Sequence, residues 1–395
     1  MRFIPTLLAA AVALTLSACG KQEAANTGSG DTVKIGAASP LTGPQSHIGQ
    51  DIKNGILLGV EDLNAQGLEI GGKKVKFELI AEDDEANPSK ATTVAQKLVD
   101  AKVVAVVGHF NSGASIPASK IYADAGIPQI SPGSTNPRYT QQGYATTFRV
   151  VANDDQQGPA GATYAINTLK VKKVAIIDDS TSYGQGLATA FENAVKAAGV
   201  EVLAHEHTTD KDTDFAAILT NIKGKNPELV FFGGIDTQGG PMAKQMKALG
   251  INAKLMGGDG IQTPKLIELA GDASDGVIAS IPGLPKDKMP GGQAFLDKFK
   301  KRFNADVELF APMGYDAVFV LAEAMKRANS TEPAKILAEL KKTNYNGVIG
   351  PIQFDDKGDL KNGPITINAV QGGKWVPVET VTPGVAAPAA PAAAK

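Results

Sequence analysis

The sequence has a single cysteine, Cys19, in a chain of 395 residues. The rest of the chain therefore holds no disulfide, no cysteine nucleophile and no cysteine metal ligand. Positive charge is not in excess, because the formal net charge is −2 and no block of lysine or arginine occurs. This balance argues against a nucleic-acid partner. Beyond the start of the chain, no stretch is long and apolar enough to be a transmembrane helix.

The sequence motifs of several enzyme classes are also missing. The chain has no P-loop, no H-E-x-x-H motif and no serine in a nucleophile elbow. We therefore expect no catalytic residue, no cofactor and no covalent chemistry, which favours a binding protein over an enzyme. Hydrophobic residues at 43% and charged residues at 20% are typical of a globular protein. The chain is too long for one compact core, so two domains are expected.

The start of the chain has the pattern of an export signal. Arg2 precedes an apolar core at residues 7–16 that is too short to span a bilayer. Residues 16–19 then resemble the lipobox of bacterial lipoproteins, in which the chain is cut before a cysteine that is acylated. We expect residues 1–19 to be a lipoprotein signal peptide with Cys19 as the lipidation site. An ordinary cleaved signal, in which Cys19 is incidental, is the alternative.

A polar segment, residues 20–31, follows and is interpreted as a tether to the membrane. The protein is thus expected in the periplasm or cell envelope, held at a membrane by its lipid. At the other end, residues 381–395 are rich in alanine and proline and are expected to be disordered.

The apolar run at residues 103–107 predicts a strand that is buried on both faces of a parallel sheet. Gly108 ends this strand, and Asn111 and Ser112 follow before a helical pattern begins. Ser112 therefore lies between the carboxyl end of a strand and the amino end of a helix. Free backbone N–H groups at such a place suit a small anion such as a carboxylate. Taken by itself, Ser112 is better interpreted as a helix cap.

Strands and helices alternate in two successive series, which predicts an α/β protein of two doubly wound lobes. The second series is expected to include a helix at residues 154–169, a buried strand at residues 174–177 and a helix at residues 241–249 that starts at Pro241. The assignment is residues 32–150 with 277–354 for the first lobe, and residues 151–276 with 355–380 for the second. Three crossovers between the lobes, near residues 148–153, 277–281 and 353–357, are expected to form a hinge.

Small or polar residues follow most of the apolar strands, and in doubly wound sheets ligands bind at these carboxyl ends. The clusters are Ser39-Pro40, Asn111-Ser112, Gly133-Ser134-Thr135, residues 180–183, Ile235-Asp236 and Asp259. Two lobes with these edges facing each other would enclose one cleft. Hydroxyl and N–H groups of the first lobe suit a carboxylate, and Asp259 of the second suits an ammonium. The pattern therefore predicts an amino acid as the ligand.

Several segments, taken in order, resemble the substrate-binding proteins of branched-chain amino acid ABC transporters. The segments are residues 40–44, 107–109, 117–119, 130–132, 155–159, 183–186, 350–351 and 357–361. The resemblance covers about residues 33–378. It implies a type I periplasmic binding protein fold and a monomer that closes on an amino acid. It also implies that the protein delivers this ligand to the membrane subunits of an ABC permease.

The resemblance implies roles for residues of the first lobe. Ser112 matches a serine that binds the α-carboxylate of the ligand. Gly133 matches a residue whose backbone carbonyl accepts from the ammonium, and Thr135 matches a threonine that contacts both groups. Ser134 lies between these two and is included in the predicted site.

Other matched positions shape the pocket. Tyr183 matches a tyrosine along the cleft, and Phe310 an aromatic residue near the ligand's side chain. Asp259 stands where the family has glutamate, while Ile48 and Ile235 stand where it has aromatic residues. These three departures leave the individual ligand open but keep its class, a branched-chain or other aliphatic amino acid. A sensing module of the envelope that binds amides or short-chain carboxylates is the alternative.

Three further residues were weighed as site residues. Asp236 could meet a polar side chain of the ligand, but we favour a solvated loop residue. His205 and His207 alternate along a predicted strand and share one side of it. A metal site would need two more ligands nearby. We therefore interpret both histidines as surface residues and predict no metal site.

Overall fold

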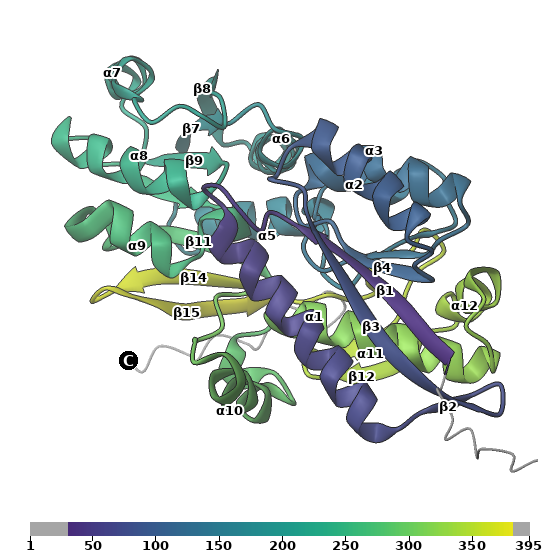
Figure 1. The fold of residues 1–395 in the computed structure, drawn as a ribbon. Helices are drawn as coiled ribbons and strands as arrows, with labels where there is room; N and C mark the ends of the chain where they lie inside the picture. The colour runs from purple at the N-terminus through teal and green to yellow at the C-terminus, as the bar shows by residue number, and fades with distance from the viewer. Residues whose placement is uncertain (1–30, 382–395) are drawn as a thin grey trace, which may run out of the picture.

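The computed structural model describes residues 31–381. Two large sheets organise these residues, one of six strands and one of seven (Figure 1). We call the six-stranded sheet and its helices the first lobe, and the seven-stranded sheet and its helices the second lobe. The predicted α/β architecture with two doubly wound lobes is confirmed. The predicted signal peptide, Cys19, nearly all of the tether and the Ala/Pro tail lie outside the described residues.

The sheet of the first lobe has the strand order β2-β3-β1-β4-β5-β6. Its strands are β1 (Asp31–Ser39), β2 (Glu69–Ile70), β3 (Lys73–Asp83), β4 (Ala105–Gly108), β5 (Gln129–Ser131) and β6 (Thr147–Arg149). All pairs are parallel except β2 with β3. Its early helices are α1 (Ser46–Gln66), α2 (Pro88–Asp100), α3 (Ser112–Asp124) and α4 (Arg138–Gln141). Parallel pairing brings the carboxyl ends of these strands to one edge.

Later elements complete the first lobe. They are α10 (Gly292–Phe303), α11 (Ala311–Ala328), α12 (Pro333–Leu340) and the small antiparallel pair β12 (Tyr345–Gly347) and β13 (Gly350–Ile352). Apolar side chains of α1 and α11 cover one face of the sheet, and those of α2 and α3 cover the other. The first lobe therefore depends on residues from both ends of the described chain.

The sheet of the second lobe has the strand order β15-β14-β11-β10-β9-β7-β8. Its strands are β7 (Lys173–Asp178), β8 (Glu201–His207), β9 (Leu229–Gly233), β10 (Lys254–Gly257), β11 (Ile278–Pro282), β14 (Ile365–Gln371) and β15 (Lys374–Val381). Its helices are α5 (Asp154–Asn167), α6 (Ser182–Ala197), α7 (Ala216–Lys225), α8 (Asp236–Ala248) and α9 (Pro264–Ala270). Helices α5 and α6 cover one face, and α7, α8 and α9 cover the other.

Local sequence explains why these elements form. Residues 105–107 and 174–177 are all fully buried, as expected for apolar strands that are covered on both faces. Helix α2 begins where the Asn87 side chain accepts hydrogen bonds from the N–H groups of Ser89 and Lys90. Pro88 occupies the first helical position, where its missing N–H costs nothing.

Two predicted boundaries differ from the structure. Residues 278–282 form β11, which pairs with β10 and β14 of the second lobe, whereas we assigned residues from 277 onward to the first lobe. This apolar run is a core strand, so the chain returns to the first lobe only after Pro282. Helix α8 begins at Asp236, earlier than the predicted start at Pro241, and Pro241 lies within the helix.

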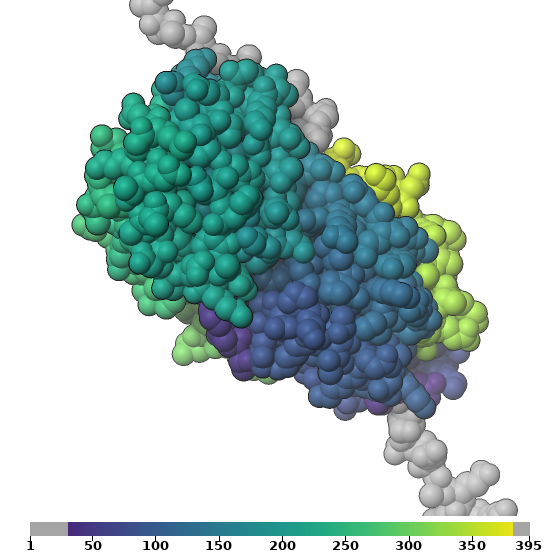
Figure 2. Space-filling view, turned by 90° about the horizontal axis from the view of Figure 1, so that it is seen from above, coloured from purple at the N-terminus to yellow at the C-terminus, as the bar shows by residue number. Residues whose placement is uncertain are grey.

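The two lobes lie against each other along their length (Figure 2). In that view the second lobe forms the teal mass and the first lobe the blue and purple one. Within residues 31–381, no helix combines the length and the hydropathy that a membrane span requires.

Candidate ligand-binding cleft between the lobes

A cavity of about 240 Å³, partly open to solvent, lies between the two lobes. Its lining residues are Phe110, Asn111, Ser112 and Gly133 from the first lobe, and Tyr183, Ile235, Asp259 and Gly260 from the second. They come from loops at the carboxyl ends of strands, as predicted for doubly wound sheets. The cavity therefore joins the strand ends that the sequence singled out.

A larger cavity, of about 980 Å³, lies beside the segments that connect the lobes. Apolar residues such as Val150, Leu284 and Met313 form much of its lining, and no acidic residue is among them. It lacks the opposed donor and acceptor groups of the interlobe cavity, which is why the interlobe cavity is the candidate site.

Two residues of the first lobe fit a carboxylate. Ser112 is the first residue of α3, where backbone N–H groups have no partner within the helix. Its hydroxyl accepts a hydrogen bond from the N–H of Asn136 at 3.2 Å. Thr135 is fully buried, and its hydroxyl has no hydrogen-bond partner among residues 31–381. A buried hydroxyl without a partner carries a desolvation cost that a bound ligand can remove.

Four predicted residues of the first lobe lie outside this lining: Thr135, which is described above, and Ser134, Ile48 and Phe310. The Ser134 hydroxyl donates to the carbonyl of Phe110 at 2.8 Å, so it holds the loop. Ile48 is buried in the core of the first lobe. Phe310 packs behind the site, with its ring centroid 5.0 Å from that of Phe110. The aromatic residue that reaches the cavity is Phe110, which the sequence analysis did not select.

Arg149 supports the loop that carries Gly133, Ser134 and Thr135. Its side chain is fully buried, and its Nε donates to Asp359 Oδ1 at 2.6 Å. The same guanidinium donates to the backbone carbonyls of Ser134 and Asn136. Arg149 is therefore a positioning residue, and only the fold reveals it because its partner is 210 positions away in the sequence.

The second lobe places Asp259 at the centre of a hydrogen-bond network. Asp259 Oδ1 accepts from Gln157 Nε2 at 2.6 Å and from the Tyr183 hydroxyl at 3.0 Å. The Tyr183 oxygen in turn accepts from the N–H of Gly260 at 2.9 Å. Gly258 permits this close approach, since a Cβ there would lie 2.7 Å from Gln157 Nε2. These contacts fix the direction of the Asp259 carboxylate.

Two buried acids lie on the second-lobe side of the cleft: Asp259 lines the cavity, whereas Asp154 lies outside the lining and is influenced by the charge of Arg149. Burial raises the pKa of Asp259 to about 6, although hydrogen bonds from Gln157 and Tyr183 oppose the rise. Burial, and then the charge of Asp259, raise the pKa of Asp154 well above its ordinary value. Neither carboxylate oxygen of Asp154 has a hydrogen-bond partner in the described chain. An ammonium group is the ligand feature that would balance such a pair.

Asp154 and Gln157 were not among the predicted site residues. Asp154 is the first residue of α5 and Gln157 lies in its first turn. The sequence signal was present, because the polar cluster at residues 153–157 directly follows a predicted crossover. We counted residues 155–159 among the segments that resemble the family but assigned them no contact with the ligand, and only the fold places Gln157 beside Asp259.

Asp236 is fully buried, so our interpretation of it as a solvated loop residue is wrong. Its carboxylate lies at the start of α8 and accepts from the Thr263 hydroxyl at 2.5 Å. The same oxygen is 2.7 Å from His47 Nε2 of the first lobe. Burial alone would lower the pKa of His47, but the hydrogen bond and charge of Asp236 outweigh it and raise this pKa. The pair therefore joins the lobes across the cleft.

Comparison with known proteins identifies relatives of the whole folded part. An amino acid binding protein of Pseudomonas aeruginosa is 40% identical over 332 residues, covering 83% of this chain and 87% of that protein. The leucine-, isoleucine-, valine-, threonine- and alanine-binding protein of the same organism is 34% identical over 337 residues, covering 85% and 89%. A crystal structure of the branched-chain amino acid transporter substrate binding protein LivJ from Streptococcus pneumoniae, in complex with isoleucine, superposes with a TM-score of 0.81. The two sequences are 29% identical, and the superposition covers 89% of this chain and 100% of the LivJ chain.

The profile of the periplasmic binding protein family matches residues 32–374. This span includes every residue of the interlobe cavity. The chain belongs to the periplasmic binding protein family.

Proposed function

We propose that this protein captures a branched-chain or other aliphatic amino acid between its lobes and delivers it to the membrane subunits of an ABC permease. One observation carries the proposal. Ser112, with the free N–H groups at the start of α3, lines one side of the cavity, and the buried carboxylate of Asp259 lines the other. An amino acid presents a carboxylate to the first and an ammonium to the second.

The apolar part of the lining supports an aliphatic ligand. Phe110 and Ile235 contribute from opposite lobes, and neither offers a polar side-chain atom. The relatives agree, since one is named for binding leucine, isoleucine, valine, threonine and alanine, and another holds isoleucine in its crystal structure. In this assignment Ser112 and Thr135 hold the carboxylate end, the Gly133 carbonyl and Asp259 hold the ammonium end, and Tyr183 orients Asp259.

Binding would close the lobes about the segments that connect them, with no covalent step and no cofactor. The working unit is a monomer in the periplasm or cell envelope, held to the membrane by a lipid on Cys19. Residues 20–30 would give this anchor its reach.

A thermal-shift panel on ligand-stripped protein tests the proposal. The chain is partly unfolded, dialysed to remove bound ligand and refolded, and then exposed to the twenty amino acids, several amides and several short-chain carboxylates. A ligand at about 100 times its Kd adds about 2.7 kcal/mol of stability and raises Tm. We expect leucine, isoleucine or valine to give the largest shift. A shift confined to amides or simple carboxylates would overturn the assignment of Asp154 and Asp259 to an ammonium.

A further inference from the structure

Two histidines and an aspartate converge at the outer edge of the second lobe, away from the cleft. The outer strand β8 runs parallel to β7, with Asp178 opposite His207 and Ile176 opposite His205. Side chains two positions apart on a strand share a face, so His205, His207 and Asp178 all stand on the same side of the sheet. The fold therefore adds a carboxylate to the pair of histidines that the sequence presents.

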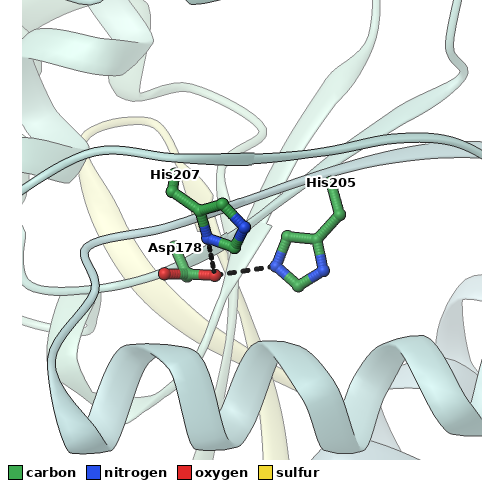
Figure 3. A group of neighbouring side chains, drawn as sticks. All are labelled: Asp178, His205 and His207. Carbon is green, nitrogen blue, oxygen red and sulfur yellow. Dashed lines mark hydrogen bonds and ion pairs between the residues drawn. The ribbon is translucent and has the colours of Figure 1, made fainter.

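The distances place all three side chains around one point. Asp178 Oδ2 lies 2.7 Å from His205 Nε2 and 2.8 Å from His207 Nδ1. One ligand atom from each residue lies within 4.8 Å of the others. Figure 3 shows both imidazole rings directed at the same carboxylate oxygen.

A fourth residue sets the orientation of His205. Glu192 of α6 has its Oε2 2.8 Å from His205 Nδ1, on the far side of the ring from Asp178. A carboxylate at Nδ1 favours a proton there, so that Nε2 is the nitrogen that can exchange its hydrogen bond to Asp178 for a metal. Metal-bound histidines commonly have such a carboxylate partner, which fixes the tautomer and makes the ring more basic. Lys196 lies 2.6 Å from Glu192 and balances its charge.

The other two histidines lack this arrangement. The chain has four histidines. His47 faces Asp236, and His109 faces the buried Asp84 at 2.6 Å. Asp236 and Asp84 each form a hydrogen bond with one imidazole, whereas Asp178 forms hydrogen bonds with two. Two nitrogen donors converging on one carboxylate are therefore peculiar to the edge of the second lobe.

We propose that Asp178, His205 and His207 form a binding site for a divalent transition metal of the Zn²⁺ type, with Glu192 as its outer partner. Two imidazole nitrogens and one carboxylate oxygen suit Zn²⁺, while Mg²⁺ and Ca²⁺ prefer oxygen alone. The His207 side chain is 56% exposed, so a water can occupy the fourth position. Bonds near 2.1 Å in a tetrahedron place ligand atoms roughly 3.4 Å apart, so the Asp178 carboxylate and both imidazoles must separate by less than about 1 Å.

Calorimetric titration of the full chain with ZnSO₄ tests the site. The protein carries no histidine tag, and every sample contains Cys19→Ser, so that no thiolate competes. We expect one Zn²⁺ per chain with a Kd of roughly 10 µM or tighter, within the range that three-ligand zinc sites reach. His205→Gln and His207→Gln should each weaken binding at least 30-fold. His47→Gln removes a histidine that faces one carboxylate and should leave the Zn²⁺ affinity unchanged.

The same samples show what would overturn the site. Absence of a one-to-one isotherm would do so, as would equal affinity in His207→Gln. Equal affinity for Ca²⁺ would also do so, because it would indicate an oxygen-only site. Cobalt provides an independent readout, since Co²⁺ bound by imidazole nitrogen gives visible absorption bands that should disappear in His205→Gln. The melting temperature of each variant without metal shows whether it has folded.

Discussion

The two walls of the cleft are built in opposite ways. The first-lobe wall presents neutral groups on a loop that is already held in place, because Arg149 donates to the carbonyls of Ser134 and Asn136. The second-lobe wall presents Asp154 and Asp259, whose charged forms are penalised by burial. The loop of the first wall is therefore held in place before a ligand binds. The buried carboxylates of the second wall are electrostatically unfavourable until a ligand supplies a positive charge. A binding protein of this design obtains rigidity from one lobe and its drive to bind from the other.

Removing Arg149 should give the largest effect on stability. In Arg149→Met, Asp359 keeps a charge with no guanidinium beside it, and the carbonyls of Ser134 and Asn136 lose a donor. Breaking one side of a buried ion pair costs about 3–5 kcal/mol. The free energy of unfolding, measured with urea, should fall by this amount.

Arg302→Met is the matched control for this change. Arg302 pairs with Glu61 through two hydrogen bonds, but its side chain is 48% exposed. An exposed ion pair contributes about 1 kcal/mol or less. Equal losses in the two variants would contradict the claim that the first-lobe wall depends on a buried charge.

Replacing Asp259 should separate binding from stability. Asp259→Asn removes the charge that would balance an ammonium, which should cost about 2–5 kcal/mol of binding free energy. The ligand-free protein should become more stable at pH 8, because a buried uncompensated charge is gone. Ser112→Ala on the opposite wall is the comparison: it should lower both affinity and stability, since the N–H of Asn136 loses its acceptor. A loss of stability in Asp259→Asn would refute the contrast between the walls.

The pH dependence of the ligand-free protein follows from the same carboxyl. Unfolded, Asp259 loses its proton near its ordinary pKa of 3.8, and folded it does so near 6. Between these values the folded state holds more protons, so stability falls as pH rises from about 4 to 6 and stays low above. The difference is on the order of 3 kcal/mol for Asp259. Asp259→Asn should remove this part of the slope, measured by urea unfolding at pH 4.5 and 8.

The pair across the cleft should give the smallest effect, with the opposite dependence on pH. His47 gains a partner in Asp236, and its pKa is raised. Its contribution to closure is fully present below the unfolded pKa of about 6.5 and is lost as pH rises through the raised value. His47→Gln should weaken ligand binding about fivefold at pH 6 and less at pH 9, by calorimetry.

His207→Gln, outside the cleft, is the control for this change. At each pH, the affinity of a variant is divided by that of wild type. Because Asp259 is present in both proteins, its effect on the pH dependence of binding is removed from this ratio. An equal ratio for His47→Gln at pH 6 and 9 would show that this pair does not join the lobes as an ion pair.

The sequence predicted what depends on neighbouring residues. The apolar runs at residues 103–107 and 174–177 mark strands. Five of the six clusters that follow predicted strand ends contribute residues to the cavity lining, because parallel strands bring their carboxyl ends together. Ser112, Tyr183 and Asp259 could thus be placed from pattern and resemblance. The ends of helices were harder to predict. Proline is common at the first position of a helix, so Pro241 was taken as the start of α8, but the helix begins at Asp236 and contains Pro241.

What could not be predicted depends on pairs that are remote in sequence. Gln157 reaches Asp259 across 102 positions, and His47 reaches Asp236 across 189. No local pattern distinguishes Asp236 from a solvated loop residue, because its burial depends on how the lobes meet. Phe110 was missed for a related reason: which of two packed rings, Phe110 or Phe310, faces the cavity is a matter of packing.

The ion pair between Arg149 and Asp359 also bears on how the protein is made. The first lobe begins at Asp31, yet it needs α11 to cover α1 and Asp359 to balance Arg149. A growing chain cannot complete this lobe until nearly all of the described residues have been synthesised. Contacts of such long range form slowly, since a large loop must close first. The polypeptide would thus stay unfolded until almost all of the described chain is available, and it would acquire its carboxylate site only then.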